Sequence, residues 1–169
     1  VGDGLHEKAT VGPLINESSV QKVERYVDIG QSEGADLLCG GQRPQGNGLS
    51  KGFFFEPTIF TRVQPGMRLE QEEIFGPVLS VVRFRSVDEA FAVNNDVKYG
   101  LSSSVYTRDV NIAMRAMNEL DTGITYINAP TIGAEAHLPF GGVKQTGNGH
   151  REGGWEVYEF YSETKVGYL

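Results

Sequence analysis

The sequence contains a single cysteine, Cys39, so it has no pair with which to form an internal disulfide. One unpaired thiol fits a reducing compartment, and a cytoplasmic location is expected. No apolar run approaches the roughly 20 residues needed to cross a bilayer, and no signal peptide is expected from the opening residues. Basic residues are few, because 15 lysines and arginines stand against 22 acids, a net charge of −7. Nucleic acid and anionic membranes are therefore poor partners, since both require a clustered basic face.

Metal ligands and nucleophiles are also scarce. The histidines His6, His137 and His150 show no metal-ligand spacing. Glu135 and His137 fit the same side of a strand, but no third ligand follows, so no metal site is predicted. Cys39 comes after two leucines and before two glycines, without a neighbouring cation to lower its pKa. We therefore expect Cys39 to be a buried structural residue and not a nucleophile.

What the sequence does have is an alternation of helices and strands. Helices are expected after capping patterns at Ser18, Ser86 and Asp109, and the first is expected to stop at Gly34. Strands are expected at 37–39 (buried), 53–60 (irregular or an edge strand, because of Pro57), 77–84 (covered on both faces), 101–107, 123–128 and, at the terminus, 162–169. The last helix is expected at 151–161. This order predicts an α/β fold with a mostly parallel sheet and flanking helices.

Two loops are candidates for function. Glu72 and Glu73 precede a Phe-Gly-Pro turn and a strand, the kind of place where α/β folds bind ligands. A carboxylate there can accept hydrogen bonds from both hydroxyls of a ribose. The alternative of two solvated acids beside a core phenylalanine fits the same pattern. The second candidate is the loop 129–149, which is long for a connection in a compact domain. Its glycine-rich end, 147–153, is not a G-x-G-x-x-G motif and is expected to form a helix-entry turn.

Several segments, taken in order, resemble motifs of the aldehyde dehydrogenase superfamily. They cover nearly the whole chain and are specific as an ordered set. The segments are 10–15 (TVGPLI), 34–41 (GADLLCGG), 52–59 (GFFFEPTI), 72–78 (EEIFGPV), 95–102 (NDVKYGLS) and 128–147, which contains PFGGVKQTG.

This resemblance implies a function. Enzymes of the family oxidise aldehydes with NAD or NADP through a cysteine thioester. The resemblance implies that Glu73 holds the nicotinamide ribose, that Phe75 packs beside the nicotinamide, and that Phe140 borders the substrate funnel. It also implies a homo-oligomer joined through the terminal strand 162–169.

The resemblance also shows what this chain lacks. In the family, the nucleophilic cysteine, the general-base glutamate and the cofactor domain precede the segment that matches residues 10–15. The chain therefore looks like a C-terminal third, with 1–161 part of the catalytic domain and 162–169 the oligomerisation strand. No catalytic residue is assigned within it, and the chain alone is expected to be inactive. The alternative is a non-catalytic module that binds or oligomerises with full-length relatives.

The loop after Asn128 bears on the substrate. Its N-A-P-T-I-G-A-E segment resembles the aminoadipate-semialdehyde, or antiquitin-like, group. That resemblance implies that Thr131, Gly133 and Ala134 anchor the substrate through backbone amides, as glycine turns can do for a carboxylate. Leu138 and Pro139 depart from the pattern of that group, so an oxo-acid semialdehyde branch remains an equal alternative. The choice between NAD and NADP also stays open.

Overall fold

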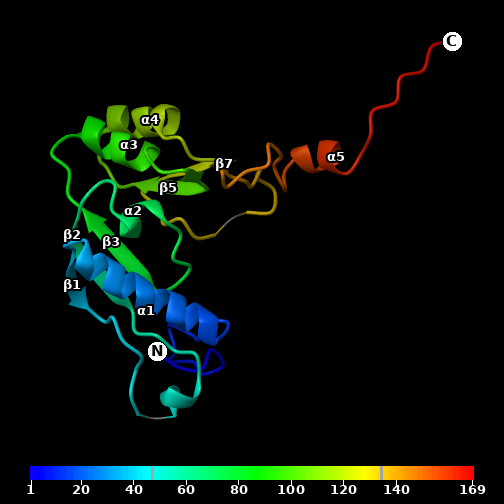
Figure 1. Ribbon diagram of the computed structural model, residues 1–169. Helices are drawn as coiled ribbons and strands as arrows, with labels where there is room; N and C mark the ends of the chain where they lie inside the picture. The colour runs from blue at the N-terminus through cyan, green and yellow to red at the C-terminus, as the bar shows by residue number, and fades with distance from the viewer. Residues whose placement is uncertain (47, 134) are drawn as a thin grey trace. The chain divides into compact units, whose positions relative to one another are not determined.

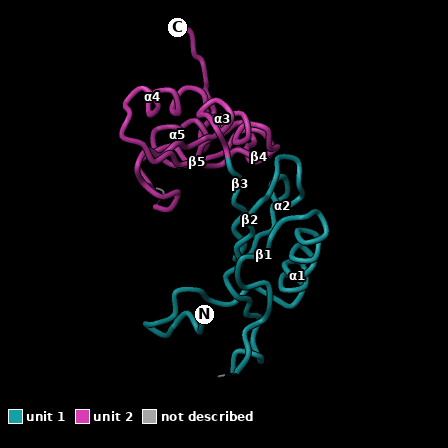
Figure 2. Tube along the Cα trace, turned by 90° about the vertical axis from the view of Figure 1, so that its left-hand side faces the viewer, with its two compact units in different colours: residues 1–83 teal, residues 84–169 magenta. Residues whose placement is uncertain are grey.

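The computed structural model describes residues 1–46, 48–133 and 135–169. The chain divides into two compact units, residues 1–83 and 84–169 (Figure 2). Both units combine helices with small sheets, so the expected α/β class is confirmed. Within the described ranges the strands form one three-stranded and two two-stranded sheets with mixed directions. The single mostly parallel sheet that the sequence predicted is therefore not what this chain forms.

Unit 1 is built on helix α1 (Glu17–Ser32) and a sheet of three strands (Figure 1). The strands are β1 (Asp36–Cys39), β2 (Thr58–Val63) and β3 (Val78–Val82). Strand β2 is central, antiparallel to β1 and parallel to β3. An edge strand at 53–60 is therefore wrong, because Pro57 precedes the strand and leaves its hydrogen-bond ladder intact. The alternative of an irregular strand is confirmed, since the register shifts in the pairing of β2 with each neighbour. A 3₁₀ turn (Leu49–Lys51) and helix α2 (Arg68–Gln71) complete the unit.

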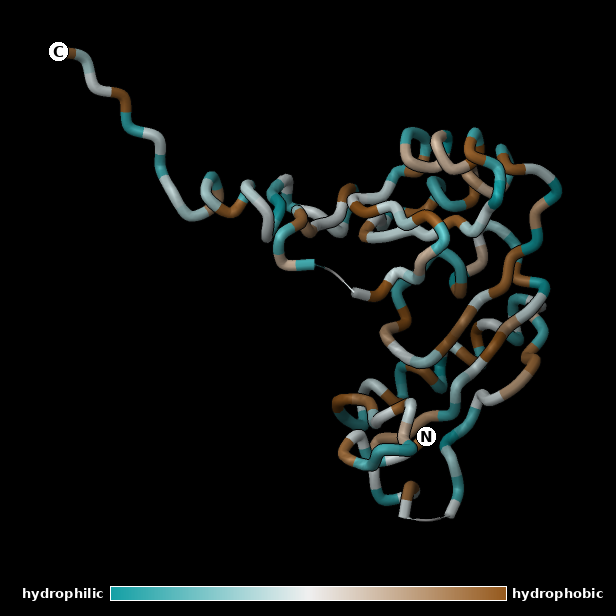
Figure 3. Tube along the Cα trace, turned by 180° about the vertical axis from the view of Figure 1, so that it is seen from behind, coloured by the Kyte–Doolittle hydropathy of each residue, from teal (hydrophilic) through white to brown (hydrophobic). Residues whose placement is uncertain are grey.

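The core of unit 1 lies between α1 and the sheet. Val20, Val23 and Val27 form the inner face of α1, at the spacing of a helix that buries one side. They pack with Phe60 and Val63 of β2, which are fully buried. Figure 3 shows hydrophobic positions concentrated along the strands of this sheet. This packing gives α1 a fixed place on the sheet.

The other strands of this sheet are more exposed than the sequence suggested. Cys39 is exposed on β1, and Leu79 is exposed on β3. The expectation of a buried Cys39 and of a strand 77–84 covered on both faces is wrong for this unit. The reason is that α1 covers only one face of the sheet, and along β3 the better-covered residues alternate with exposed ones.

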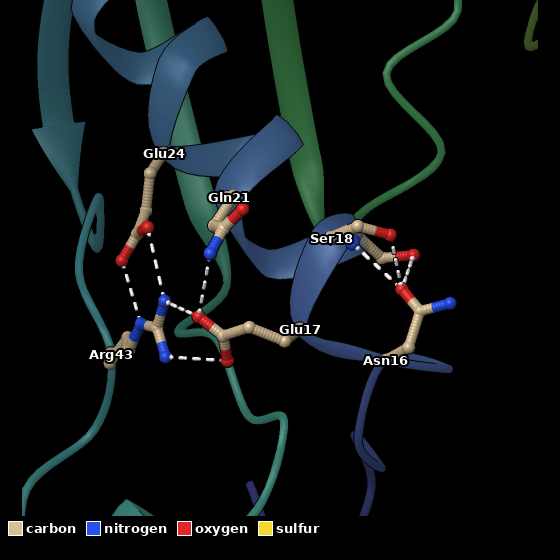
Figure 4. A network of polar contacts seen from close by, with 7 residues as sticks. Asn16, Glu17, Ser18, Gln21, Glu24 and Arg43 are labelled. Atoms are coloured by element: carbon tan, nitrogen blue, oxygen red, sulfur yellow. Dashed lines mark hydrogen bonds and ion pairs between the residues drawn. The ribbon is translucent and has the colours of Figure 1, made fainter.

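Helix α1 starts two residues earlier than expected. Asn16, not Ser18, is the N-cap, and its Oδ1 accepts a hydrogen bond of 2.9 Å from the Ser19 amide (Figure 4). Asparagine is among the residues preferred at this position because it satisfies an amide that has no partner in the helix. At the other end Gly34 adopts a φ of 93°, so the predicted stop is confirmed.

Arg43 ties the segment after β1 to this helix. Its guanidinium lies 2.6 Å from Glu17 Oε1 and 2.7 Å from Glu24 Oε1 (Figure 4). The hydrogen bond from Arg43 lowers the pKa of Glu17. These contacts lie on a face of α1 that is separate from its buried valines.

Unit 2 places helices α3 (Val87–Asn95) and α4 (Val110–Glu119) beside a parallel strand pair (Figure 1). The pair consists of β5 (Ser102–Val105) and β6 (Ile124–Ile127). The side chains that form the core of this unit are Phe91, Ala116 and Leu120, with Val105 and Ile127 packed against them. The predicted caps are confirmed, since Ser86 accepts from the Glu89 amide and Asp109 from the Asn111 amide.

The C-terminal part of unit 2 has less regular structure. Strand β4 (Tyr99–Gly100) pairs antiparallel with β7 (Val143–Lys144), and α5 (Glu156–Phe160) is shorter than the predicted 151–161. Residues 162–169, all of them described, form no helix or strand. The expected terminal strand is thus not formed in the single chain, because a strand requires a neighbour for its backbone hydrogen bonds. Among the described residues, no helix has both the length and the apolar character needed to span a membrane.

Candidate functional site

The loop 72–77, between α2 and β3, alternates inward and outward side chains. Ile74 is only 9% exposed and belongs to the core of unit 1. Its neighbours Glu73 and Phe75 are exposed, and Phe75 is exposed to 80%. The loop therefore exposes one carboxylate and one aromatic ring just before β3.

The two adjacent carboxylates have different surroundings. Glu72 accepts a hydrogen bond of 2.6 Å from the hydroxyl of Tyr26 on α1. Arg68 donates to the same carboxylate from Nε and from a terminal nitrogen, at 3.0 and 2.9 Å. The hydrogen bond to Glu72, together with burial, raises the pKa of Tyr26. Glu72 is thus a structural carboxylate whose charge is already engaged.

Glu73 is held by its backbone instead. Lys22 Nζ donates a hydrogen bond of 2.7 Å to the Glu73 carbonyl oxygen. Within the described ranges the carboxylate of Glu73 has no hydrogen bond or ion pair. The carboxylate is therefore free to accept hydrogen bonds from a ligand, and its two oxygens suit a pair of neighbouring hydroxyls.

Phe75 has an unusual backbone conformation. Its φ is +61°, in the left-handed region that a bulky residue rarely occupies. Such a conformation costs roughly 1–2 kcal/mol, and an exposed phenyl ring gains nothing from burial to offset it. Backbone strain of this kind concentrates at functional sites. The exposed ring and the strained backbone make Phe75 a candidate binding residue.

The loop after β6 starts from a rigid anchor. Asn128 has a φ of +55°, and its side chain both accepts from the Thr107 amide and donates to the Thr107 carbonyl, each at 2.9 Å. Beyond this anchor Thr131 and Gly133 are exposed, and Gly133 has a φ of +90°. Ala134, the third predicted substrate contact of this loop, lies outside the described residues.

Phe140 stands at the far end of the same loop. Its amide and carbonyl form a bridge with Glu152, with hydrogen bonds of 2.6 and 2.8 Å. The ring is 38% exposed and lines a pocket of about 400 Å³, which also includes Thr146 and Phe160. An aromatic wall beside an open hollow is compatible with the predicted role at a substrate entrance.

The predicted site residues fall into two groups. Glu73 and Phe75 lie together in unit 1, whereas Thr131, Gly133 and Phe140 belong to unit 2. Within the described part of the chain, no group of three or more histidine, cysteine, aspartate or glutamate side chains is placed to hold a metal ion. Glu135 and His137, the pair considered as metal ligands from the sequence, have Oε2 and Nδ1 3.6 Å apart.

Sequence reasoning did not identify the residues of α1 that contact the 72–77 loop. Lys22 and Tyr26 are one turn apart on α1, so a helical periodicity places them on one face. Their partners Glu73 and Glu72 follow 51 and 46 residues later. No local pattern announces a contact across such a separation, and Lys22 looks like any solvated charge on a helix.

Comparison with known proteins shows what this chain resembles. The model of the aldehyde dehydrogenase family matches residues 1–166. An alpha-ketoglutarate semialdehyde dehydrogenase of Haloferax volcanii is 43% identical over 99% of this chain and 35% of its own length. A betaine aldehyde dehydrogenase of Brucella anthropi is 43% identical over 100% of this chain and 34% of its own. The chain thus spans about a third of the length of the curated relatives it matches.

Solved structures show a similarity to the same family. The crystal structure of apo betaine aldehyde dehydrogenase from Staphylococcus aureus, a G234S mutant, has a TM-score of 0.90 and 40% identity, covering 95% of this chain and 32% of that one. A structure of the same enzyme in complex with NAD+ has the same TM-score and identity and covers 95% of this chain and 31% of that one. The fold of the present chain is therefore that of the corresponding part of these enzymes.

Proposed function

This chain belongs to the aldehyde dehydrogenase family, and we propose that it is the C-terminal part of an NAD(P)-dependent enzyme that oxidises an aldehyde to a carboxylic acid. The observation that carries the proposal is the carboxylate of Glu73, which is exposed and has no partner among the described residues. Its neighbour in sequence, Glu72, is engaged by Tyr26 and Arg68. Only one of the two acids is thus available to a ligand.

The residues present fit a nicotinamide cofactor. Glu73 would accept hydrogen bonds from the ribose hydroxyls, and Phe75 would pack beside the nicotinamide. When bound, the cofactor supplies a hydride acceptor. The complex of the Staphylococcus aureus relative with NAD+ supports NAD as the cofactor. The free acid and the exposed ring on adjacent outward positions of one short loop support the assignment of these two residues.

For the substrate we propose a semialdehyde that carries a carboxylate. Thr131, Gly133 and Ala134 would bind the carboxylate through backbone amides, and Phe140 would border the entrance. The positive φ of Gly133 and its exposure suit a turn that directs N–H groups outward. Relatives named for alpha-ketoglutarate semialdehyde and for betaine aldehyde are each 43% identical, so the choice of a carboxylate-bearing substrate rests on this loop.

The nucleophile is proposed to lie outside this chain. The lone thiol, Cys39, is on strand β1 and not on the 72–77 or 128–140 loops. The purified chain should therefore form no NADH or NADPH from an aldehyde. Turnover that disappears on Cys39→Ala would contradict this and would make Cys39 catalytic.

The proposal is tested by Glu73→Gln in the complete protein. Hydrogen bonds to a charged group contribute about 1.5–3 kcal/mol each, and about 1.4 kcal/mol corresponds to a tenfold change in rate. Hydride transfer in single-turnover experiments should slow by roughly ten- to a hundredfold. The matched substitution Glu72→Gln should have a much smaller effect. Equal effects of the two substitutions would contradict the assignment of Glu73.

A further inference from the structure

We infer that Tyr26 is a positioning residue for the cofactor: through Glu72 it sets the register of the 72–77 loop so that Glu73 and Phe75 face outward. This inference rests on the proposed function. Tyr26 lies on α1, and its hydroxyl reaches Glu72 at 2.6 Å. It is the side-chain contact that fixes the first residue of the loop to the core helix.

Helix α1 holds the loop at further points. Lys22 Nζ binds the Glu73 carbonyl at 2.7 Å. A Cβ added to Gly76 would lie 2.4 Å from Val23 Cγ2, so the loop backbone touches a fully buried side chain. Residues 22, 23 and 26 of one helical turn therefore contact residues 73, 76 and 72. The loop therefore packs along the surface of α1.

Inward and outward side chains alternate over residues 72–75, so the position of the loop on α1 decides which of them are exposed. Glu72 contacts Tyr26 and Ile74 lies in the core, whereas Glu73 and Phe75 are exposed. The backbone is not extended throughout, since Phe75 has a φ of +61°, so these directions depend on the loop keeping its position on α1. A slipped loop would bury the carboxylate of Glu73 against the core and expose Ile74. The link between Tyr26 and Glu72 opposes that slip.

Tyr26 contributes more to this than Arg68. The Arg68–Glu72 pair joins residues four apart, at an exposed position, and such pairs contribute little. It also connects α2 only to the residue directly after it. Tyr26 is 7% exposed, and its ring lies 5.6 Å from the Arg68 guanidinium. The hydrogen bond from Tyr26 joins α1 to the loop across 46 residues, as the Lys22 contact with Glu73 does across 51.

The expected effect is on the population of the binding-competent loop. If Tyr26→Phe lowers that population, the apparent Kd for NAD+ rises by the same factor. We expect a rise of about tenfold or more, the factor that corresponds to the loss of one hydrogen bond to a charged group. The rate of hydride transfer at saturating NAD+ should change less than twofold, because bound cofactor selects the ordered loop.

The experiment is a double-mutant cycle on the complete protein, with Tyr26→Phe and Glu73→Gln alone and together. NAD+ affinity is measured by titration, and amide hydrogen exchange of residues 73–76 is measured without cofactor. Two matched controls accompany them. Tyr106→Phe removes an exposed hydroxyl in unit 2, and Glu24→Gln removes a carboxylate that an arginine binds elsewhere on α1. Neither control should alter NAD+ affinity.

The inference predicts that Tyr26→Phe weakens NAD+ binding and accelerates exchange at 73–76, in the parent and in Glu73→Gln alike, because a smaller population of ordered loop multiplies the apparent Kd whatever residue 73 contributes. Unchanged NAD+ affinity in Tyr26→Phe would overturn the inference. Unchanged exchange at 73–76 would also overturn it, even if affinity fell. If Glu73→Gln weakens binding and Tyr26→Phe does not, the proposed function stands and this inference fails. If Glu73→Gln leaves binding unchanged, both fail.

Discussion

Lys22 Nζ lies 2.7 Å from the backbone carbonyl oxygen of Glu73, so Glu73 is fixed by its main chain while its carboxylate stays available. The adjacent residue shows the reverse, because Glu72 is fixed through its carboxylate. The two glutamates thus differ because α1 binds the backbone of one, through Lys22, and the carboxylate of the other, through Tyr26. The predictions below follow from this arrangement.

Because the backbone of Phe75 is strained, glycine should be more stable than alanine at this position, the reverse of the usual order. Glycine in place of alanine normally destabilises a protein through its larger loss of entropy. At a φ of +61° the alanine retains the left-handed penalty of roughly 1–2 kcal/mol, which glycine does not have. Phe75→Gly should therefore unfold at a higher temperature than Phe75→Ala, while both weaken NAD+ binding. Calorimetry of the two variants measures this, and a more stable alanine variant would show that Phe75 is not strained.

The phenol of Tyr26 should lose its proton at a higher pH than an ordinary tyrosine does. Its hydrogen bond to Glu72 raises its pKa above the ordinary value of 10.0. Because the folded pKa is raised, the stabilisation is complete below about pH 10 and is lost as the pH rises through the folded pKa. The difference between ultraviolet titrations of the parent and of Tyr26→Phe isolates this one phenol. Its midpoint should fall when Glu72 is replaced by glutamine, and an unchanged midpoint would mean that the hydrogen bond is not formed in solution.

Gly76 is required by its contact with Val23. A methyl group at this position would lie 2.4 Å from Val23 Cγ2, which belongs to a fully buried side chain. Gly76→Ala should cost about 1–3 kcal/mol of stability, as overpacking commonly does, and should displace the loop. Gly4→Ala is the control, since no heavy atom lies within 4 Å of its added Cβ. Equal melting temperatures for the two variants would contradict the close packing of the loop on α1.

The C-terminal residues should mediate self-association. Tyr168 is 95% exposed, and Val166 and Leu169 are also largely exposed. Apolar surface beyond a few hundred Å² usually marks an interface. We expect the isolated chain to form at least dimers at roughly micromolar concentration, held soluble by its net charge. Deleting residues 162–169 should give a monomer with unchanged helix content. Sedimentation decides the matter: a monomeric parent, or a truncated chain that still dimerises, would contradict the prediction.

What could be predicted from the sequence was mostly local. The caps at Ser86 and Asp109 depend on groups within three residues, and both are present. The contact between Tyr26 and Glu72 depends on how α1 lies on the sheet, which no local pattern encodes. The exposure of Cys39 escaped prediction for a similar reason, because an apolar strand reveals its hydrophobicity but not which of its faces this chain covers. The roles of Glu73 and Phe75 came from resemblance, and the structure adds why one acid is free and the other is not.

The most direct measurement is a crystal structure of the complete protein with bound NAD+, read at Glu73. The account predicts that the Glu73 carboxylate lies within about 2.5–3.0 Å of the nicotinamide ribose hydroxyls, with Phe75 beside the nicotinamide and Glu72 still bound to Tyr26. A ribose held by other groups, with Glu73 turned to solvent or Glu72 in its place, would contradict the account.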